Sequence, residues 1–499
     1  MWQRTSELLS KSNWLIVNLL YILKRMRKDV GIMTNVNFNE NKIPSYIKNA
    51  DSTVTAEHAK NVNQDLLPTK ERIMGKLSYL CMWMSGCVVI GTFTAGSTVF
   101  GVLNLTQSII AMVIGCICIA LALVLNGRAG HTYGIPMTIQ MRTSFGIVGS
   151  KIAGLIRAIP AIVWFGFQSW VGGGALNLVL NTLFGFDHLI LCFVVFHILQ
   201  IALALKGFHG IKWLENIGAV FILVTLIYMC YTTVTKYGTV IADSVINIEG
   251  TWGLGFWAGV TVFLGLYTGI ILNVSDLSRN FTKSSGDFTR GLIYLTAILP
   301  CTLLMCLIGL IVAAATGVYD PITIFSSTVD NPILLIATML FIIFSQITTN
   351  VLNNMVPPIY VIMDLAKVSF PKAAVITGIL AVCTFPWKLV TAESAAGLAL
   401  FIQIYSAFLG PIFAVMVVDY FIIRKKQLLI DEMYNPGGSF AGINWAGIIA
   451  IIVGALAAVA IVEIGWFAGL LPAGITYFLL MTKTSLGKRF CKGTKYETN

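Results

Sequence analysis

The chain alternates between long apolar stretches and short polar connections. The residues between Lys76 and Arg128 include no charged side chain and no histidine, and similar stretches recur to about residue 482. A helix that crosses the hydrocarbon of a bilayer takes roughly 20 apolar residues. The strands of a membrane barrel are instead short segments of alternating polarity. The pattern therefore predicts an all-α polytopic membrane protein.

From these stretches we expect twelve membrane helices in one transmembrane domain, residues 71–483. Their predicted bounds are 77–101, 105–126, 153–182, 188–205, 213–235, 255–274, 290–316, 332–357, 373–388, 394–421, 444–462 and 464–482. We expect residues 1–70, which are polar and basic, to be cytoplasmic and poorly ordered, and residues 484–499 to form a basic cytoplasmic tail. The composition agrees, because 57% of the residues are hydrophobic and 11% are charged, against about 25% charged in average soluble domains.

The beginning of the chain contains one apolar run that does not predict a span. The run from Asn13 to Leu23 is too short to cross the hydrocarbon. Basic residues follow this run, whereas in a secretory signal they precede it. Two interpretations remain open for residues 1–32. Either they include a segment that lies on the membrane surface, or they do not belong to the native protein, which then starts at Met33.

Basic residues are distributed unevenly between alternate loops. With the N-terminus inside, the outer loops contain only Lys236 and Lys388. The inner loops hold the other basic residues between the predicted spans, from Arg128 after the second span, through Arg157, to Lys426 after the tenth. Cytoplasmic loops of membrane proteins are enriched in Lys and Arg. We therefore expect both termini to be cytoplasmic in a plasma (inner) membrane protein. The net charge of +11 then needs no nucleic-acid partner.

The sequence lacks the residue sets of a membrane enzyme or a resident metal site. There is no HExxH, no CxxC and no Cys/His cluster, and the ten cysteines lie mostly within apolar stretches. His197, deep in a predicted span, is expected to pack or to form hydrogen bonds. Asp276, Asp364 and Asp419 fall at predicted inner helix ends, where we expect water and Lys or Arg neighbours. We predict no enzyme, no cofactor and no obligate protein partner.

Several polar and aromatic residues lie inside predicted spans and indicate a binding site. Trp164 and Gln168 are four residues apart and share one helix face. This pair suits a flat heterocycle, which stacks on the ring and bonds to the amide. Thr348 and Thr349 offer adjacent hydroxyls without charge, as a weakly held alkali ion requires. Back-bonding of these hydroxyls to their own helix is the alternative. Glycines in the first and sixth spans predict interrupted helices or close packing.

The same residues belong to an ordered set of motifs. The set is Asn126-Gly-Arg-Ala-Gly130, Tyr133-Gly134-Ile135-Pro136, Arg142-Thr-Ser-Phe145-Gly146, Trp164-Phe-Gly-Phe-Gln168, Thr348-Thr-Asn350 with Asn354, Pro386-Trp387-Lys388, Leu409-Gly410-Pro411 and Asp419-Tyr420-Phe421. With it the chain resembles the nucleobase–cation symporters, which are permeases for cytosine, purines, uracil, thiamine, allantoin and hydantoins. The resemblance runs from about Asp65 to Thr482.

The resemblance implies a leucine-transporter-like architecture. Two inverted repeats of five helices would cover residues 77–235 and 255–421, with two extra helices in 444–482. The implied substrate site contains Trp164, Gln168, Leu266, Tyr267, Asn354 and Val89. Tyr267 would contribute the face of its ring, and Val89 stands where hydantoin and allantoin carriers have an amide. The implied sodium site uses carbonyls of Ser85, Val88 and Ser345 and hydroxyls of Thr348 and Thr349.

The expected function is secondary active import of a neutral planar nitrogen heterocycle, coupled to sodium. A permease of the same fold that is coupled to protons, or to no ion, is the alternative. A membrane sensor that binds the same ligand without transporting it is an alternative of a different class. Which heterocycle is carried stays open, because a single contact decides between close analogues.

Overall fold

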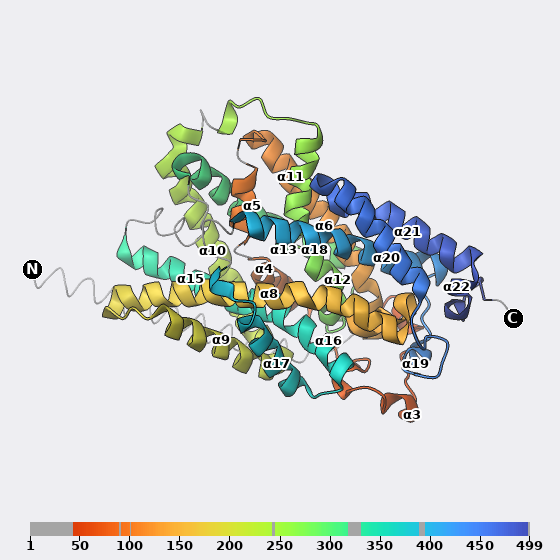
Figure 1. Ribbon diagram of the computed structural model, residues 1–499. Helices are drawn as coiled ribbons and strands as arrows, with labels where there is room; N and C mark the ends of the chain where they lie inside the picture. Colours follow the sequence, from red (N-terminus) through yellow and green to blue (C-terminus); the bar gives the residue numbers. More distant parts are fainter. Residues whose placement is uncertain are drawn as a thin grey trace, which may run out of the picture.

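The computed structural model describes residues 43–88, 91–99, 101–241, 245–317, 331–388 and 395–497, which are largely helical (Figure 1). The longer helices are α4 (Lys76–Gly86), α5 (Gly91–Thr98), α6 (Leu105–Tyr133), α8 (Arg142–Phe184), α9 (Leu189–Leu205), α10 (Gly207–Ile241), α11 (Leu254–Gly265), α12 (Thr268–Ser278), α13 (Asp287–Thr316), α15 (Pro332–Asn350), α16 (Val356–Ala366), α17 (Phe370–Val382), α18 (Ala395–Val417), α20 (Trp445–Ala460) and α21 (Gly465–Lys483). Two π-helices, η4 (Val351–Met355) and η7 (Val418–Ile423), continue α15 and α18.

Each predicted span corresponds to one of these helices or to consecutive helical pieces. Among the described residues, eight helical stretches are long and apolar enough to cross a membrane, and α4 with α5 forms a further, bent candidate. Two more helices, α9 and α20, are apolar but shorter. The all-α polytopic fold is therefore confirmed, whereas the count of twelve crossings stays a prediction. The largest difference in bounds is at α8, which begins at Arg142 instead of 153.

Helix interruptions occur in the first span of each half of the domain. The axes of α4 and α5 differ by 67° across the residues that follow Gly86. In the second half, α11 ends at Gly265 and α12 begins at Thr268, so Leu266 and Tyr267 lie at the break. These are the positions at which the glycine pattern predicted interrupted helices. Broken helices expose backbone groups that can bind ions and polar ligands within the membrane.

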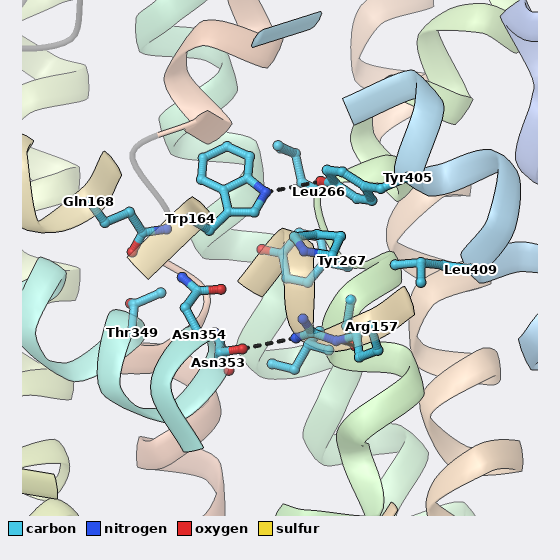
Figure 2. A pocket seen from close by; sticks show the side chains of 13 residues that line it. Arg157, Trp164, Gln168, Leu266, Tyr267, Thr349, Asn353, Asn354, Tyr405 and Leu409 are labelled. Carbon is cyan, nitrogen blue, oxygen red and sulfur yellow. Dashed lines mark hydrogen bonds between the residues drawn. The ribbon is translucent and has the colours of Figure 1, made fainter. Parts of the chain in front are cut away.

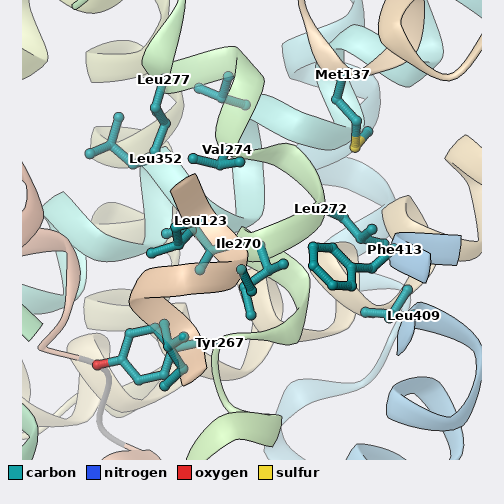
Figure 3. Close-up of a cluster of buried hydrophobic side chains, with 14 of the residues drawn as sticks. Leu123, Met137, Tyr267, Ile270, Leu272, Val274, Leu277, Leu352, Leu409 and Phe413 are labelled. Carbon is teal, nitrogen blue, oxygen red and sulfur yellow. The ribbon is translucent and has the colours of Figure 1, made fainter. Parts of the chain in front are cut away.

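The buried core surrounds α12, the second half of the broken sixth span. Figure 3 shows Ile270 and Leu272 of this helix beside Leu409 and Phe413 of α18. Leu272 and Val274 are fully buried, and α12 also packs along α6. In a membrane, burial inside the protein exchanges lipid contacts for protein contacts, so close packing is the main source of stability here. The core therefore holds the broken helix at a fixed place in the bundle.

Residues 43–75 lie across one end of the helical bundle. Arg279 donates two hydrogen bonds to the Asp65 carbonyl (3.0 and 3.1 Å), and the Tyr434 hydroxyl donates to the carbonyl of Leu66 (2.8 Å). Leu66 itself is fully buried. These tertiary contacts supply partners for the backbone of Asp65 and Leu66, and the poor order expected of residues 1–70 stays a prediction. Residues 1–42, including Met33 and the apolar run before it, lie outside the described residues.

The three aspartates expected at solvated helix ends are buried instead. Asp364 pairs with Arg142 (2.5 Å), and Asp419 pairs with Arg424 (2.8 Å). Asp276, Asp364 and Asp419 expose 0%, 7% and 0% of their surface. The prediction of contact with water is therefore wrong, whereas the expected basic neighbours are present at Asp364 and Asp419. A buried ion pair is costly to break, because removal of one partner leaves a charge without a counter-charge.

Candidate functional site

One cavity lies where the broken sixth span meets α8, α18 and the π-helix η4 (Figure 2). Its lining consists of Arg157, Pro160, Trp164, Gln168, Leu266, Tyr267, Gly269, Ile270, Thr349, Asn353, Asn354, Tyr405 and Leu409. Five of the six residues implied as substrate ligands are in this set, and the sixth, Val89, lies outside the described residues. The structure thus brings together these five residues, which are up to 190 positions apart in the sequence.

Trp164 forms one wall of the cavity and is held by its ring nitrogen. Its Nε1–H donates to the Tyr405 hydroxyl of α18 (3.2 Å). A β-carbon added to Gly91 would lie 3.3 Å from the indole and 3.4 Å from Leu266, so the start of α5 packs directly on this wall. The indole is 8% exposed. A large aromatic ring in this setting offers a flat apolar face to a planar ligand.

Tyr267 stands at the break between α11 and α12, and its hydroxyl contacts two other helices. The hydroxyl lies 3.2 Å from the carbonyl oxygen of Cys87, to which it can donate, and 2.9 Å from the hydroxyl of Thr302. Cys87 directly follows α4, so this contact links the breaks of the first and sixth spans. Sequence reasoning assigned Tyr267 only a ring face, and the structure adds an anchoring role for its hydroxyl.

Two amide side chains supply the polar edge of the cavity. Gln168 lies one helical turn after Trp164 on α8, and its Oε1 is buried without a hydrogen-bond partner among the described residues. Asn354 belongs to η4, and its Nδ2 donates to Asn350 Oδ1 (2.9 Å). A π-turn changes which side chains face inward, and such turns often occur at functional sites. Here Asn353 and Asn354, neighbours in the sequence, both line the cavity.

The residues implied as sodium ligands form two groups. The Thr349 hydroxyl donates to the carbonyls of Ser85 (2.9 Å) and Val88 (3.2 Å), at the point where α4 ends. The Thr348 hydroxyl donates to the carbonyl of Ser345 (3.1 Å) in its own helix, as the back-bonding alternative predicted. Thr349 also lines the cavity. All of these groups are neutral oxygens, and hard monovalent cations are bound by such ligands.

Arg157 lines the same cavity and was missed by sequence reasoning. It was counted among the inner-loop charges, although it falls within the first residues of the predicted span 153–182. The structure places it inside α8, where it is 2% exposed and donates to Gly269 O (2.7 Å), Asn273 Oδ1 (2.7 Å) and Asn353 O (2.9 Å). Its position seven residues before Trp164, two helical turns on the same face, was the signal that could have found it. Arg157 thus joins α8 to α12 and η4.

Comparisons with known proteins show the family of the chain. A family profile described as "Permease for cytosine/purines, uracil, thiamine, allantoin" matches residues 66–480. The chain is 30% identical to an allantoin permease of Bacillus subtilis, over 84% of this chain and 93% of the relative. It is 23% identical to a hydantoin permease of Microbacterium maritypicum, over 85% of this chain and 89% of the relative.

The fold is also that of a solved transporter. A structure of Mhp1, a nucleobase-cation-symport-1 family transporter in a closed conformation with bromovinylhydantoin bound, superposes with a TM-score of 0.78. The two chains are 20% identical, and the match covers 88% of this chain and 98% of the other. A structure of a sodium-coupled sialic acid symporter superposes with a TM-score of 0.54 at 12% identity. The leucine-transporter-like fold is confirmed, and so is the prediction of a transporter rather than an enzyme.

Proposed function

Because the chain belongs to the family of permeases for cytosine/purines, uracil, thiamine and allantoin, we propose that it imports a planar nitrogen heterocycle by sodium-coupled alternating access. The substrate class is that of a nucleobase, allantoin or a hydantoin. The protein is a multi-pass membrane transporter, and we place it in the plasma (inner) membrane with both termini cytoplasmic. This orientation rests on the excess of Lys and Arg in alternate loops.

The observation that carries the proposal is the composition of the cavity wall. Two aromatic side chains line the cavity, Trp164 from α8 and Tyr267 from the break between α11 and α12. The amides of Gln168 and Asn354 lie beside them. A planar heterocycle has an apolar face and an edge that alternates hydrogen-bond donors and acceptors. The rings would stack on its face, and the amides would bond to its edge. Uncharged amides suit a neutral substrate.

Sodium is the coupling ion that the oxygen groups favour. The Thr349 hydroxyl already lies within hydrogen-bond distance of Ser85 O and of Val88 O, and the carbonyl of Ser345 and the hydroxyl of Thr348 would complete the set. These groups come from α4 and α15, so an ion between them would stabilise one relative position of the two helices. Coupling then follows from a difference in sodium affinity between conformations, and it is reciprocal for sodium and substrate.

Uptake measurements test the proposed function. Cells that express the protein and lack their own uptake are given labelled allantoin, hydantoin, uracil, cytosine and hypoxanthine, in sodium or in choline medium. We expect saturable uptake of at least one compound, with higher affinity in sodium. The absence of uptake for the whole panel, at demonstrated membrane abundance, would contradict the substrate class. Uptake that follows pH and ignores sodium would favour the proton-coupled alternative.

The substitution Thr349→Val tests the ion site separately. Valine keeps the shape of threonine but removes the oxygen, while Gln168 and Asn354 stay unchanged. Coupling free energies are typically about 1–3 kcal/mol, so sodium should shift wild-type substrate affinity on the order of 5–150-fold. In the variant we expect this shift to shrink while sodium-free binding remains. Equilibrium binding titrated with sodium measures it, and a full sodium shift in the variant would exclude Thr349 as a ligand.

A further inference from the structure

The amide of Asn354 is the end of a buried chain of hydrogen bonds that leads away from the cavity. The chain starts at a backbone carbonyl, Phe165 O in α8, which can only accept. Asn350 Nδ2 lies 3.0 Å from this oxygen and therefore has to be the donor. The same Nδ2 donates to Gln200 Oε1 (2.9 Å). The orientation of the Asn350 amide is thus fixed by its surroundings, because a flip would oppose two oxygens.

The fixed orientation of Asn350 determines the orientation of Asn354. With its nitrogen turned to Phe165, Asn350 presents Oδ1 on the other side, and Asn354 Nδ2 donates to it at 2.9 Å. Asn354 therefore turns its nitrogen toward Asn350. One N–H of the Asn354 amide is donated to Asn350, and its carbonyl oxygen, on the other side of the amide group, is available to another partner. Since Asn354 lines the cavity, a bound molecule would meet this oxygen with a donor.

A second layer of buried side chains supports Asn350. Gln200 Nε2 donates to the Ser169 hydroxyl (2.9 Å), and Ser169 donates to the Phe165 carbonyl (2.6 Å). His197 adds the outermost contact, because its Nδ1 lies 3.1 Å from Ser169 Oγ. The prediction that this histidine forms hydrogen bonds is confirmed. Asn350, Gln200 and Ser169 are at most 1% exposed, so water does not compete for these bonds.

Gln168 differs from Asn354 in this respect. Its Oε1 has no partner among the described residues, and no neighbouring backbone group fixes which end of its amide faces the cavity. Gln168 can therefore turn to match a donor or an acceptor on a ligand. The polar edge of the site thus combines an amide that can turn, Gln168, with an amide whose orientation is fixed, Asn354.

We propose that Asn350, Gln200 and Ser169 are positioning residues that hold Asn354 as an obligate hydrogen-bond acceptor, so that the transporter selects heterocycles with a ring N–H at this edge. The inference rests on the proposed function, since it concerns the same site. A ligand that offers a ring oxygen or an alkylated nitrogen there leaves the Asn354 carbonyl unpaired in a buried place. Sites built to bond a polar group reject analogues that lack it far more strongly than apolar pockets reject a change of size.

Equilibrium binding to the purified protein in saturating sodium tests the selection. The probes are hydantoin, oxazolidine-2,4-dione, in which ring oxygen replaces one N–H, and 3-methylhydantoin, which lacks the other. The variants are Asn350→Leu, and Gln200→Leu one layer further from the cavity. The matched control is Gln346→Leu, which removes another buried amide from the same helix, α15, outside the cavity lining and the hydrogen-bond chain.

We expect wild type to bind at least one of the two analogues about 10-fold or more weakly than hydantoin. In Asn350→Leu the amide of Asn354 is free to turn its nitrogen toward the ligand, so the affinity for the analogue relative to hydantoin should rise severalfold, with a smaller rise in Gln200→Leu. Gln346→Leu should keep the wild-type ratio. A purely structural role would weaken all three probes equally and keep the ratio, which would overturn the inference while leaving the proposed function. Failure of every probe, and of the uptake panel, would overturn both.

Discussion

Replacement of Tyr267 by phenylalanine separates the two roles that the structure gives this side chain. The substitution keeps the ring that lines the cavity and removes the hydroxyl that lies 3.2 Å from Cys87 O and 2.9 Å from Thr302 Oγ1. Cys87 lies between Ser85 and Val88, whose carbonyls accept from Thr349. We therefore expect Tyr267→Phe to disturb the ion site more than the stacking of the substrate.

The magnitude follows from the burial of the groups left behind. Tyr267 is 2% exposed, and the Cys87 carbonyl and the Thr302 hydroxyl would both lose a partner in a dry environment. A buried polar group without its partner costs about 1–3 kcal/mol. If about half of that cost falls on the sodium-bound conformation alone, sodium affinity drops roughly 3–10-fold, because 1.4 kcal/mol is a factor of ten.

Substrate binding titrated with sodium measures this effect. In Tyr267→Phe, the sodium concentration at half-maximal effect should rise, while substrate affinity at saturating sodium stays within about twofold of wild type. Tyr267→Ala should weaken both the effect of sodium and the affinity for substrate. Tyr294→Phe is the matched control, since Tyr294 is also fully buried and bonded through its hydroxyl, to Tyr79 at 3.0 Å, but lies outside the cavity lining. An unchanged sodium dependence in Tyr267→Phe would refute the anchoring role.

Three further predictions address the site, the orientation and the segment before α4. Trp164→Ala should weaken substrate binding about 5–150-fold, because stacking on an aromatic side chain is worth about 1–3 kcal/mol per base; normal uptake at normal abundance would exclude this wall. A reporter fused after residue 499 should behave as cytoplasmic and one in the 317–331 loop as external, and the reverse would refute the orientation. Partial burial opposes the charge of Asp431, but hydrogen bonds from Thr55 and His58 outweigh it and lower the pKa of the carboxyl below its ordinary 3.8. At pH values above the ordinary pKa, this contact therefore stabilises the segment that contains Thr55 and His58. The contact is lost as the pH falls through the lowered pKa of Asp431. Limited proteolysis at residues 43–60 should accelerate in wild type as the pH falls below 3.8, and this acceleration should be absent in Asp431→Asn.

The membrane helices were predictable because each depends on a pattern of residues that are close together in the sequence. Helices α6 and α13 follow from apolar stretches that are longer than the hydrocarbon thickness, and the break at Tyr267 followed from glycines spaced along one span. Trp164 and Gln168 were found as a pair because four residues along a helix define one face. Such features depend on neighbours in the sequence, so a single chain reveals them.

The features that were missed depend on contacts between distant segments. Arg157 was taken for a loop charge, since nothing local indicates that oxygens of α12 and η4 would satisfy a cation inside the bundle. The burial of Asp419 depends on Arg424 and on the Tyr477 hydroxyl, which donates to it at 2.9 Å from α21. The π-turn at Asn354 also has no sequence signature of its own. Each of these features depends on tertiary packing, which the periodicity of the sequence does not indicate.

Equilibrium binding of labelled allantoin, hydantoin and uracil to purified wild type, Trp164→Ala and Asn354→Leu tests the central claim most directly. The account predicts that at least one compound binds saturably to wild type, that its affinity rises with sodium, and that both substitutions weaken it by about tenfold or more while the proteins remain folded. Binding that is unaffected by either substitution would contradict the assignment of the substrate to the cavity between α8, the broken sixth span and η4.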